Sequence, residues 1–213
     1  MIGREAGPER TQRGLERLVY FSDAVVAIAI TLIVLPLVDS AREVASSSTA
    51  EFLSDNVFAL TAAGVSFIVI STLWRDHHRL FERATGYTAR LLRVNMLWLC
   101  AIVALPVATV LVVYARHGDR LAVGLYVGVM LCAMVVIRIE ELMLYRAGLL
   151  ADREPVTAVD LATRWISVAA TGIALLVAVT VPRIGLWALL ILIVAGLLES
   201  AVRRWRKARD VQP

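Results

Sequence analysis

Six long apolar runs constrain this chain more than any other feature of its sequence. Each is close to the roughly 20 residues that an α-helix needs to cross a bilayer. Polar or proline-containing links separate them. The runs extend over residues 18–38, 52–74, 92–114, 121–145, 161–181 and 184–200. We therefore predict an all-α integral membrane protein with six transmembrane helices.

The composition agrees with a single membrane domain. Hydrophobic residues make up 59% of the chain and the mean hydropathy is +0.74, above the apolar share of roughly half that soluble domains show. We place the six-helix domain at residues 17–202, after an N-terminal segment (1–16) and before a basic tail (203–213). Cys100 and Cys132 lie in apolar runs without a CxxC pair, so we expect buried free thiols.

The distribution of basic residues predicts the orientation. Most of the 22 lysines and arginines fall in the N-terminal segment, in the links after the second and fourth runs, and in the C-terminal tail. Positively charged loops remain in the cytoplasm. We therefore expect a multi-pass protein of the cell membrane with both termini cytoplasmic. Because topology accounts for the basic charge, we expect no nucleic-acid partner.

One stripe of bulky side chains follows the first apolar run. On a period of 3.6 residues, Ile28, Leu32 and Leu35 fall on one narrow face, which Phe21 extends towards the N-terminus. Thr31 lies about 60° to one side of this face. From spacing alone, the stripe could simply be a seam where the helix packs on its neighbours.

Polar residues gather where the first three runs begin or end on the cytoplasmic side. Charged groups inside a membrane domain are costly and normally face protein or water. The predicted topology brings these residues to a similar depth, where each polar group could satisfy another. Independent solvated groups are the alternative. The predicted polar cluster comprises Arg17, Phe21, Ser22, Asp23, His77 and Asn95.

The adjacent histidines His77 and His78 suggest a metal site at first sight. Neighbouring residues on a helix point about 100° apart, so the two rings cannot share one ion. The sequence offers no third ligand at suitable spacing. We therefore predict no metal site here.

Motifs typical of enzymes are missing from the sequence. It contains no Gly-rich phosphate loop, no HExxH and no GxSxG. Glu140 and Glu141 are adjacent and diverge on a helix, so they would not form a catalytic pair. Glu141 is better placed as an i,i+3 partner of Arg138. We predict no enzymatic activity and no cofactor.

The run RxxxFSD at residues 17–23, followed by AxxAIAIT and VLP, resembles the signature of a known channel family. That family is the endolysosomal potassium channel family (transmembrane protein 175) with its prokaryotic relatives. A W–HH–F pattern at residues 74–81 also resembles prokaryotic members. Since FSD occurs once, the chain is similar to the single-unit prokaryotic kind.

The resemblance implies a homotetramer in a lipid bilayer, with four first helices around a central pore. Ile28, Leu32 and Leu35 match the family's hydrophobic pore positions, and Thr31 matches a threonine that can face the ion path. Asp39 could supply negative charge at the outer mouth. The filter sequence TVGYG is missing, so selectivity must arise differently. The implied function is a potassium-selective or weakly selective cation channel with a hydrophobic gate and K⁺ as the permeating ion.

Two other functions remain open from the sequence. A small secondary transporter would usually show internal symmetry and a broken or charged helix near mid-membrane. Only Pro106 offers such a break, and no ionisable group accompanies it in the third run. A membrane scaffold with no ion path is the other alternative.

Overall fold

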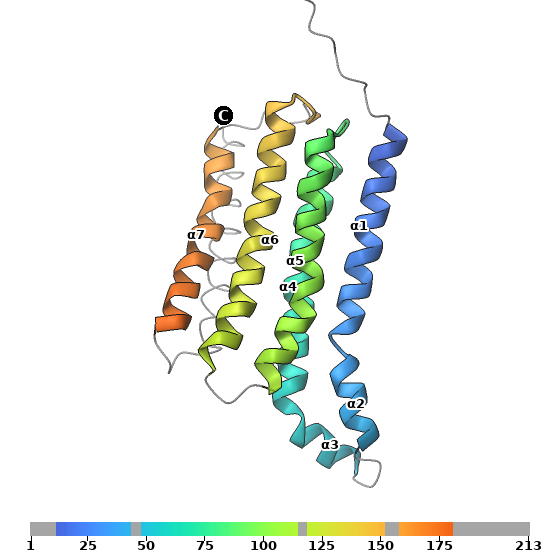
Figure 1. Ribbon diagram of the computed structural model, residues 1–213, viewed down its shortest axis with the longest axis vertical. Helices are drawn as coiled ribbons and strands as arrows, with labels where there is room; N and C mark the ends of the chain where they lie inside the picture. The colour runs from blue at the N-terminus through green and yellow to red at the C-terminus, as the bar shows by residue number, and fades with distance from the viewer. Residues whose placement is uncertain (1–11, 44–47, 115–118, 152–157, 181–213) are drawn as a thin grey trace, which may run out of the picture.

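The computed structural model describes residues 12–43, 48–114, 119–151 and 158–180. Its long helices run side by side along the long axis of the molecule, with α1 at one edge and α7 at the other (Figure 1). Helices α4 and α5 lie between α1 and α6. The elements are α1 (Gln12–Leu32), α2 (Leu35–Glu43), α3 (Thr49–Asp55), α4 (Val57–Phe81), α5 (Ala89–Tyr114), α6 (Arg120–Arg146) and α7 (Ala158–Thr180).

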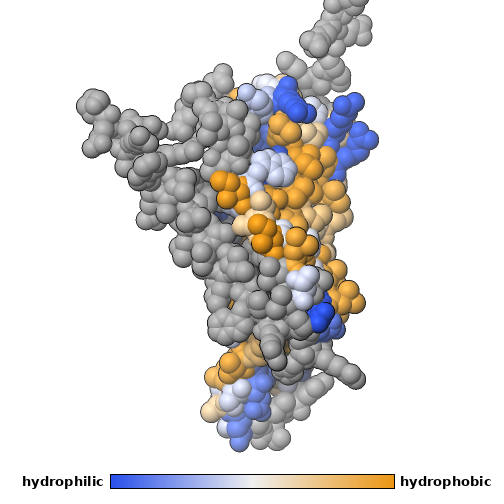
Figure 2. Space-filling view, turned by 90° about the vertical axis from the view of Figure 1, so that its left-hand side faces the viewer, coloured by the Kyte–Doolittle hydropathy of each residue, from blue (hydrophilic) through white to orange (hydrophobic). Residues whose placement is uncertain are grey.

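Four helical segments in the described part of the chain are long and apolar enough to cross a membrane. They are Gln12–Ala41, Val57–Phe81, Ala89–Tyr114 and Arg120–Arg146. They correspond to the first four predicted runs, which confirms the all-helical membrane class. The fifth run overlaps α7, whereas the sixth run lies outside the described residues, as do segment 1–11 and the C-terminal tail. Hydrophobic residues gather at mid-height on the face in Figure 2, with hydrophilic residues towards both ends.

The first apolar run is not one continuous helix as predicted, because the helix is interrupted between Leu32 and Leu35. Pro36 gives the physical reason. It has no N–H to donate to the carbonyl of Leu32, and its ring crowds that carbonyl. The chain therefore turns and resumes as α2, where Pro36 occupies the first turn, the part of a helix that tolerates proline.

The second apolar run also differs in its boundaries from the prediction. A separate short helix, α3, begins with a capping box. The backbone N–H and the hydroxyl of Ser48 donate to the carboxylate of Glu51 over 2.9 and 3.1 Å, which lowers the pKa of that carboxyl. The helix is interrupted at Asn56, and α4 then runs from Val57 to Phe81. The polar residues that follow Trp74 are therefore helical and form the last two turns of α4.

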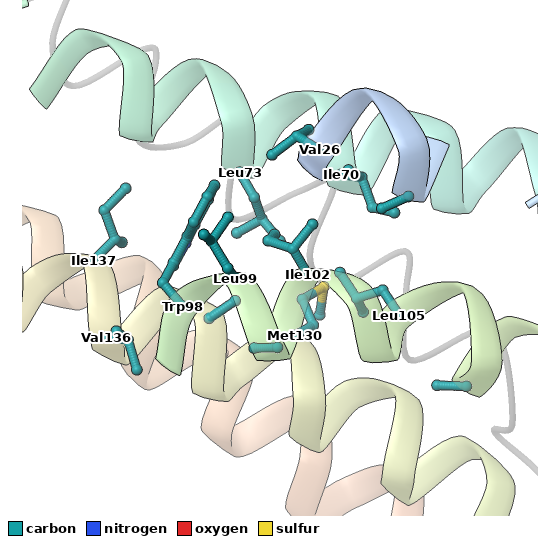
Figure 3. Packing of buried hydrophobic residues seen from close by; sticks show 14 of the residues in the cluster. Val26, Ile70, Leu73, Trp98, Leu99, Ile102, Leu105, Met130, Val136 and Ile137 are labelled. Atoms are coloured by element: carbon teal, nitrogen blue, oxygen red, sulfur yellow. The ribbon is translucent and has the colours of Figure 1, made fainter. Parts of the chain in front are cut away.

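The core lies where α1, α4, α5 and α6 meet. Figure 3 shows Val26 of α1, Ile70 and Leu73 of α4 and Ile102 of α5 pointing towards one another. Met130 reaches the same region from α6. All five side chains are buried. Burial of a large aliphatic side chain stabilises a fold by roughly 1.5–3 kcal/mol in water, whereas between helices in a bilayer the close packing itself is the stabilising contribution.

The loops after α4 and α6 are joined at one end of the bundle. Gly148, with φ of 66°, ends α6 in a left-handed conformation that glycine adopts readily. Leu149 then accepts a hydrogen bond from the N–H of Thr85 over 2.9 Å, and Ala151 donates to the carbonyl of Arg83 over 2.8 Å. These bonds fix the ends of α4 and α6 relative to each other.

The cysteines depart from the prediction in their burial. Cys100 and Cys132 are free, but both are exposed. They lie on outward faces of α5 and α6, beside apolar residues such as Val103 and Val107 that are also exposed. A bilayer is itself apolar, so a small hydrophobic thiol in a spanning helix does not need to be buried in protein.

Candidate functional site

Helix α1 presents two different faces. One face packs into the bundle through small and aliphatic side chains: Leu15, Leu18, Ser22, Val26 and Ala29. The other face carries the predicted stripe, where Ile28 is 59% exposed, Leu32 41% and Leu35 52%. Phe21 is also exposed at the N-terminal end of this face. Within the single chain, the stripe is therefore not a packing seam inside the bundle.

Thr31 lies on the exposed side of α1. Its hydroxyl donates to the carbonyl of Ile28, one turn earlier in the same helix, over 2.7 Å. Because this bond uses the only hydroxyl proton, the oxygen keeps its lone pairs for an acceptor role. The group can thus present negative partial charge to a cation that approaches this face.

Leu35 and Asp39 belong to α2 and are separated from the rest of the stripe by the turn before Pro36. Both side chains are exposed. The hydroxyls of Ser40 and Tyr114 are 3.3 Å apart, which ties α2 to the end of α5. The stripe is therefore carried by two helical segments, each packed on α5 or its end.

Three of the predicted polar residues form one buried hydrogen-bonded chain. The hydroxyl of Ser22 donates to the carbonyl of Leu18 over 2.9 Å. The amide nitrogen of Asn95 donates to Ser22 Oγ over 2.9 Å, and Asn95 Oδ1 lies 2.8 Å from His77 Nε2. Since Asn95 Oδ1 can only accept, His77 Nε2 must carry a proton. The chain joins α1, α5 and α4 through fully buried groups.

The ring of His77 is held between two aromatic side chains. It stacks on Trp98 with centroids 4.1 Å apart and on Phe81 at 4.4 Å. His78 instead stacks on Trp74 at 5.3 Å and lies near Glu82. The two neighbouring histidines therefore diverge, and no cluster with metal-ligand geometry is found among the described residues.

Asp23, Arg17 and Phe21 lie outside this hydrogen-bonded chain. Asp23 accepts a hydrogen bond from the indole N–H of Trp74 over 2.8 Å. Arg17 and Phe21 line a pocket of about 300 Å³ between α1, the start of α5 and Tyr87. In the described part of the chain, Arg17 makes no ion pair with Asp23. The six residues of the predicted cluster thus divide into three separate environments.

Several residues that shape this region were not singled out from the sequence. Trp98 is one example, since its fully buried indole stacks on His77. Trp74 belongs to the W–HH–F pattern, but the sequence did not indicate its hydrogen bond to Asp23. The hydroxyl of Ser66 lies 2.8 Å from Thr109 and 3.2 Å from Tyr126, which forms a second buried contact among α4, α5 and α6. Hydroxyls scattered in apolar runs give no pairing signal in one sequence.

The predicted i,i+3 ion pair of α6 is confirmed. Arg138 lies 3.0 Å from Glu141, and it also reaches Asp76 of α4 at 3.1 Å. The second bond depends on how α4 and α6 pack, which spacing along one helix cannot indicate.

Comparison with known proteins identifies similar sequences and solved structures with a similar fold. A family profile described as "Endosomal/lysosomal potassium channel TMEM175" matches residues 17–106. A protein of Streptomyces collinus named as a potassium channel is 30% identical over 143 residues, covering 64% of this chain and 67% of that protein. A second potassium channel, of Chamaesiphon minutus, is 32% identical over 132 residues, covering 61% and 64%. The chain thus spans about two thirds of the length of these relatives.

A solved structure shares the fold. It is described as the crystal structure of a lysosomal potassium-selective channel TMEM175 homolog from Chamaesiphon minutus. The TM-score is 0.57 and the sequence identity 24%, with 86% of this chain and 99% of that chain covered. At this identity, the likeness describes the arrangement of the helices.

Proposed function

The chain belongs to the TMEM175 family of potassium channels, and from this membership we propose that it conducts K⁺ across a membrane. Members of this family are ion channels and not enzymes. The permeating ion is K⁺, and the channel is either selective for K⁺ or prefers K⁺ weakly over Na⁺. No resident cofactor takes part in the proposed mechanism.

The single observation that supports this proposal best is the exposure of the aliphatic stripe on α1. Helix α1 packs on the bundle by one face only. Its other face exposes three large aliphatic side chains, those of Ile28, Leu32 and Leu35, which project away from the bundle. Several copies of this face, arranged around an axis, would produce rings of aliphatic side chains. Closed cyclic symmetry is the usual way to arrange such copies. A homotetramer, as the family resemblance implies, gives four per ring.

Conduction would be limited by these rings, which form the proposed gate. A narrow aliphatic constriction loses water readily and then blocks ions, whereas a wider one stays wet and conducts. Thr31 would contribute its hydroxyl oxygen beside the constriction, since its proton is bonded to Ile28. Asp39 would add negative charge at the outer mouth and raise the local cation concentration.

The polar cluster would brace the pore helix from inside its own subunit. Ser22 is bonded to Asn95, and Asp23 to Trp74, so α1 is attached to both α5 and α4 near one end. These directional bonds hold α1 at a fixed rotation about its axis and keep the stripe turned outwards. Arg17 and Phe21 would then stand at the cytoplasmic entrance, next to the exposed face.

We also propose the orientation that the basic residues predict. The protein would be a multi-pass protein of the cell membrane with both termini cytoplasmic. Residues 1–16 would form the cytoplasmic N-terminal segment, 17–202 the channel domain and 203–213 the cytoplasmic tail.

A flux assay tests the proposal. Purified protein in liposomes loaded with K⁺ should release K⁺ down its own gradient, and an imposed voltage should change the rate. A secondary transporter would release K⁺ only when a second solute gradient is supplied, and a scaffold would release none. Either of those outcomes, obtained with folded protein, would refute channel function. Empty liposomes and liposomes with an unrelated membrane protein are the controls.

A further inference from the structure

A pocket of about 330 Å³ lies between the end of α4 and the second half of α6, and none of its lining residues belongs to α1. Three arginines and three carboxylates line it, together with the aliphatic residues Leu80 and Ile137. The proposed ion path does not use this pocket. A ligand can be bound by those charged groups of the pocket that have no partner within the protein.

The carboxylates of the pocket already have partners. Arg138 reaches Asp76 at 3.1 Å and Glu141 at 3.0 Å. The third carboxylate, of Glu82, lies 3.3 Å from Nε2 of His78. A cationic ligand would therefore have to compete with these internal contacts.

Two arginines of the pocket are in the opposite situation. Arg79 and Arg83 are four residues apart at the end of α4, and both side chains line the pocket. Within the described ranges, neither guanidinium forms a hydrogen bond or ion pair. Each offers five N–H donors in a planar fork that matches an oxyanion. The helix dipole favours a cation near a helix C-terminus, which accounts for the presence of one arginine there. It does not account for two arginines that line the same cavity.

We propose that this pocket binds a phosphate group through Arg79 and Arg83. Either a phospholipid headgroup or a soluble phosphate ester can supply that chemistry. The pocket lies where α4 passes from its apolar stretch to charged residues, and basic pockets at this level between helices suit anionic headgroups. Arg138 stays with Asp76 and Glu141 and reduces their repulsion of the ligand.

Lipid and phosphate binding to the purified protein tests this proposal. Native mass spectrometry would count bound phosphatidylglycerol, with diacylglycerol of the same acyl chains as the phosphate-free comparison. Thermal protection by glycerol 3-phosphate would test a soluble source. The test variant is R79Q/R83Q. The control is R90Q/R93Q, which removes two exposed arginines at the start of α5, at the same end of the bundle but outside the pocket.

We expect saturable binding of a phosphate-bearing ligand and no comparable binding of diacylglycerol. Each arginine near an anionic headgroup contributes about fivefold to affinity, so R79Q/R83Q should weaken binding roughly 10- to 30-fold. R90Q/R93Q should change it by less than about twofold. Saturable binding of phosphatidylglycerol without thermal protection by glycerol 3-phosphate would identify a headgroup site, and protection by glycerol 3-phosphate would identify a soluble ligand.

Three results would overturn the proposal: binding that does not saturate, equal losses in the two double variants, or no binding of either phosphate compound by the folded wild type. Equal losses would mean general attraction of basic residues to anionic lipid. The variant R79K/R83K keeps both charges but loses the planar forks, so its affinity should lie between those of the wild type and R79Q/R83Q. A melting temperature of ligand-free R79Q/R83Q equal to that of the wild type shows that its loss of binding does not come from misfolding.

Discussion

The indole N–H of Trp74 donates to Oδ1 of Asp23 across 2.8 Å, and this bond joins α4 to α1. Both side chains are half-buried. The sequence placed this aspartate in a polar cluster with Arg17 and His77 and did not indicate Trp74 as its partner. The observed pairing means that an aromatic side chain holds the carboxylate in place, so the bond can be removed while an aromatic ring is kept at this position.

Replacing Trp74 by Phe should destabilise the protein by about 1.5–3 kcal/mol, the usual contribution of a hydrogen bond to a charged group. The ring that stacks on His78 is retained in this variant. Asp23→Asn, which keeps an acceptor oxygen, should cost less. Thermal unfolding in detergent measures both. If Trp74→Phe is as stable as the wild type while Arg17→Gln is not, Asp23 depends on a different partner.

Asn95→Leu, which breaks the buried hydrogen-bonded chain of Ser22, Asn95 and His77, should destabilise the protein more than Trp74→Phe. It leaves the buried N–H of His77 without an acceptor, which costs about 1–3 kcal/mol. Ser22 loses the donor of Asn95 but keeps its own hydrogen bond to the carbonyl of Leu18. Thr61→Val is the control, because that hydroxyl is exposed and bonds only to the carbonyl of Val57 in its own helix. A melting temperature of Asn95→Leu that equals that of Thr61→Val would contradict the bracing role.

The stripe on α1 is tested by Ile28→Asn and Leu35→Asn. If these residues surround a pore, polar rings hold water better than aliphatic ones, so the K⁺ current should rise and discrimination against Na⁺ should weaken. Val107→Asn on α5 is the matched control, since Val107 is exposed to a similar degree, 61%, on another helix. Single-channel recording is the measurement. Unchanged current in folded stripe variants would place the pore elsewhere.

Gly14 is predicted to be a position where even an added methyl group forces Tyr87 to move. A Cβ at this position would lie 2.6 Å from the hydroxyl oxygen of Tyr87, which packs against α1 from the loop before α5. Gly14→Ala should therefore displace Tyr87 and destabilise the fold by roughly 1–3 kcal/mol. Gly64→Ala, with nothing within 4 Å of the added Cβ, should be neutral or gain up to about 1 kcal/mol from helix propensity. Similar melting temperatures for the two variants would argue against this contact.

The orientation can be checked by cysteine labelling at the two ends of α4. Asp55 and Glu82 lie beyond opposite ends of this helix, whose 25 residues give it a length of about 37 Å. In a background without Cys100 and Cys132, we expect an impermeant reagent added outside intact cells to label Asp55→Cys and not Glu82→Cys. The reverse pattern would mean that the termini face outwards.

Features that depend on neighbours along the chain were predictable. The lengths of the first four apolar runs predict four spanning helices, because an isolated backbone in lipid must form its hydrogen bonds within one segment. The pair of Arg138 and Glu141 follows from helix geometry alone. The motif at residues 17–23 indicated the family before any fold was known.

Other features were decided by the packing of distant segments. The sequence could not predict the hydrogen bond between Trp74 and Asp23. Several polar groups lie at a similar depth, and the rotation of each helix about its axis decides which of them meet. Nor could the sequence show that the ring of His77 stacks on Trp98 and Phe81. Sequence alone therefore determined the helices, their polar ends and the family. The tertiary structure decided which side chains meet, because hydrogen bonds and ring stacking act only over a few ångströms and depend on how α1, α4 and α5 rotate against one another.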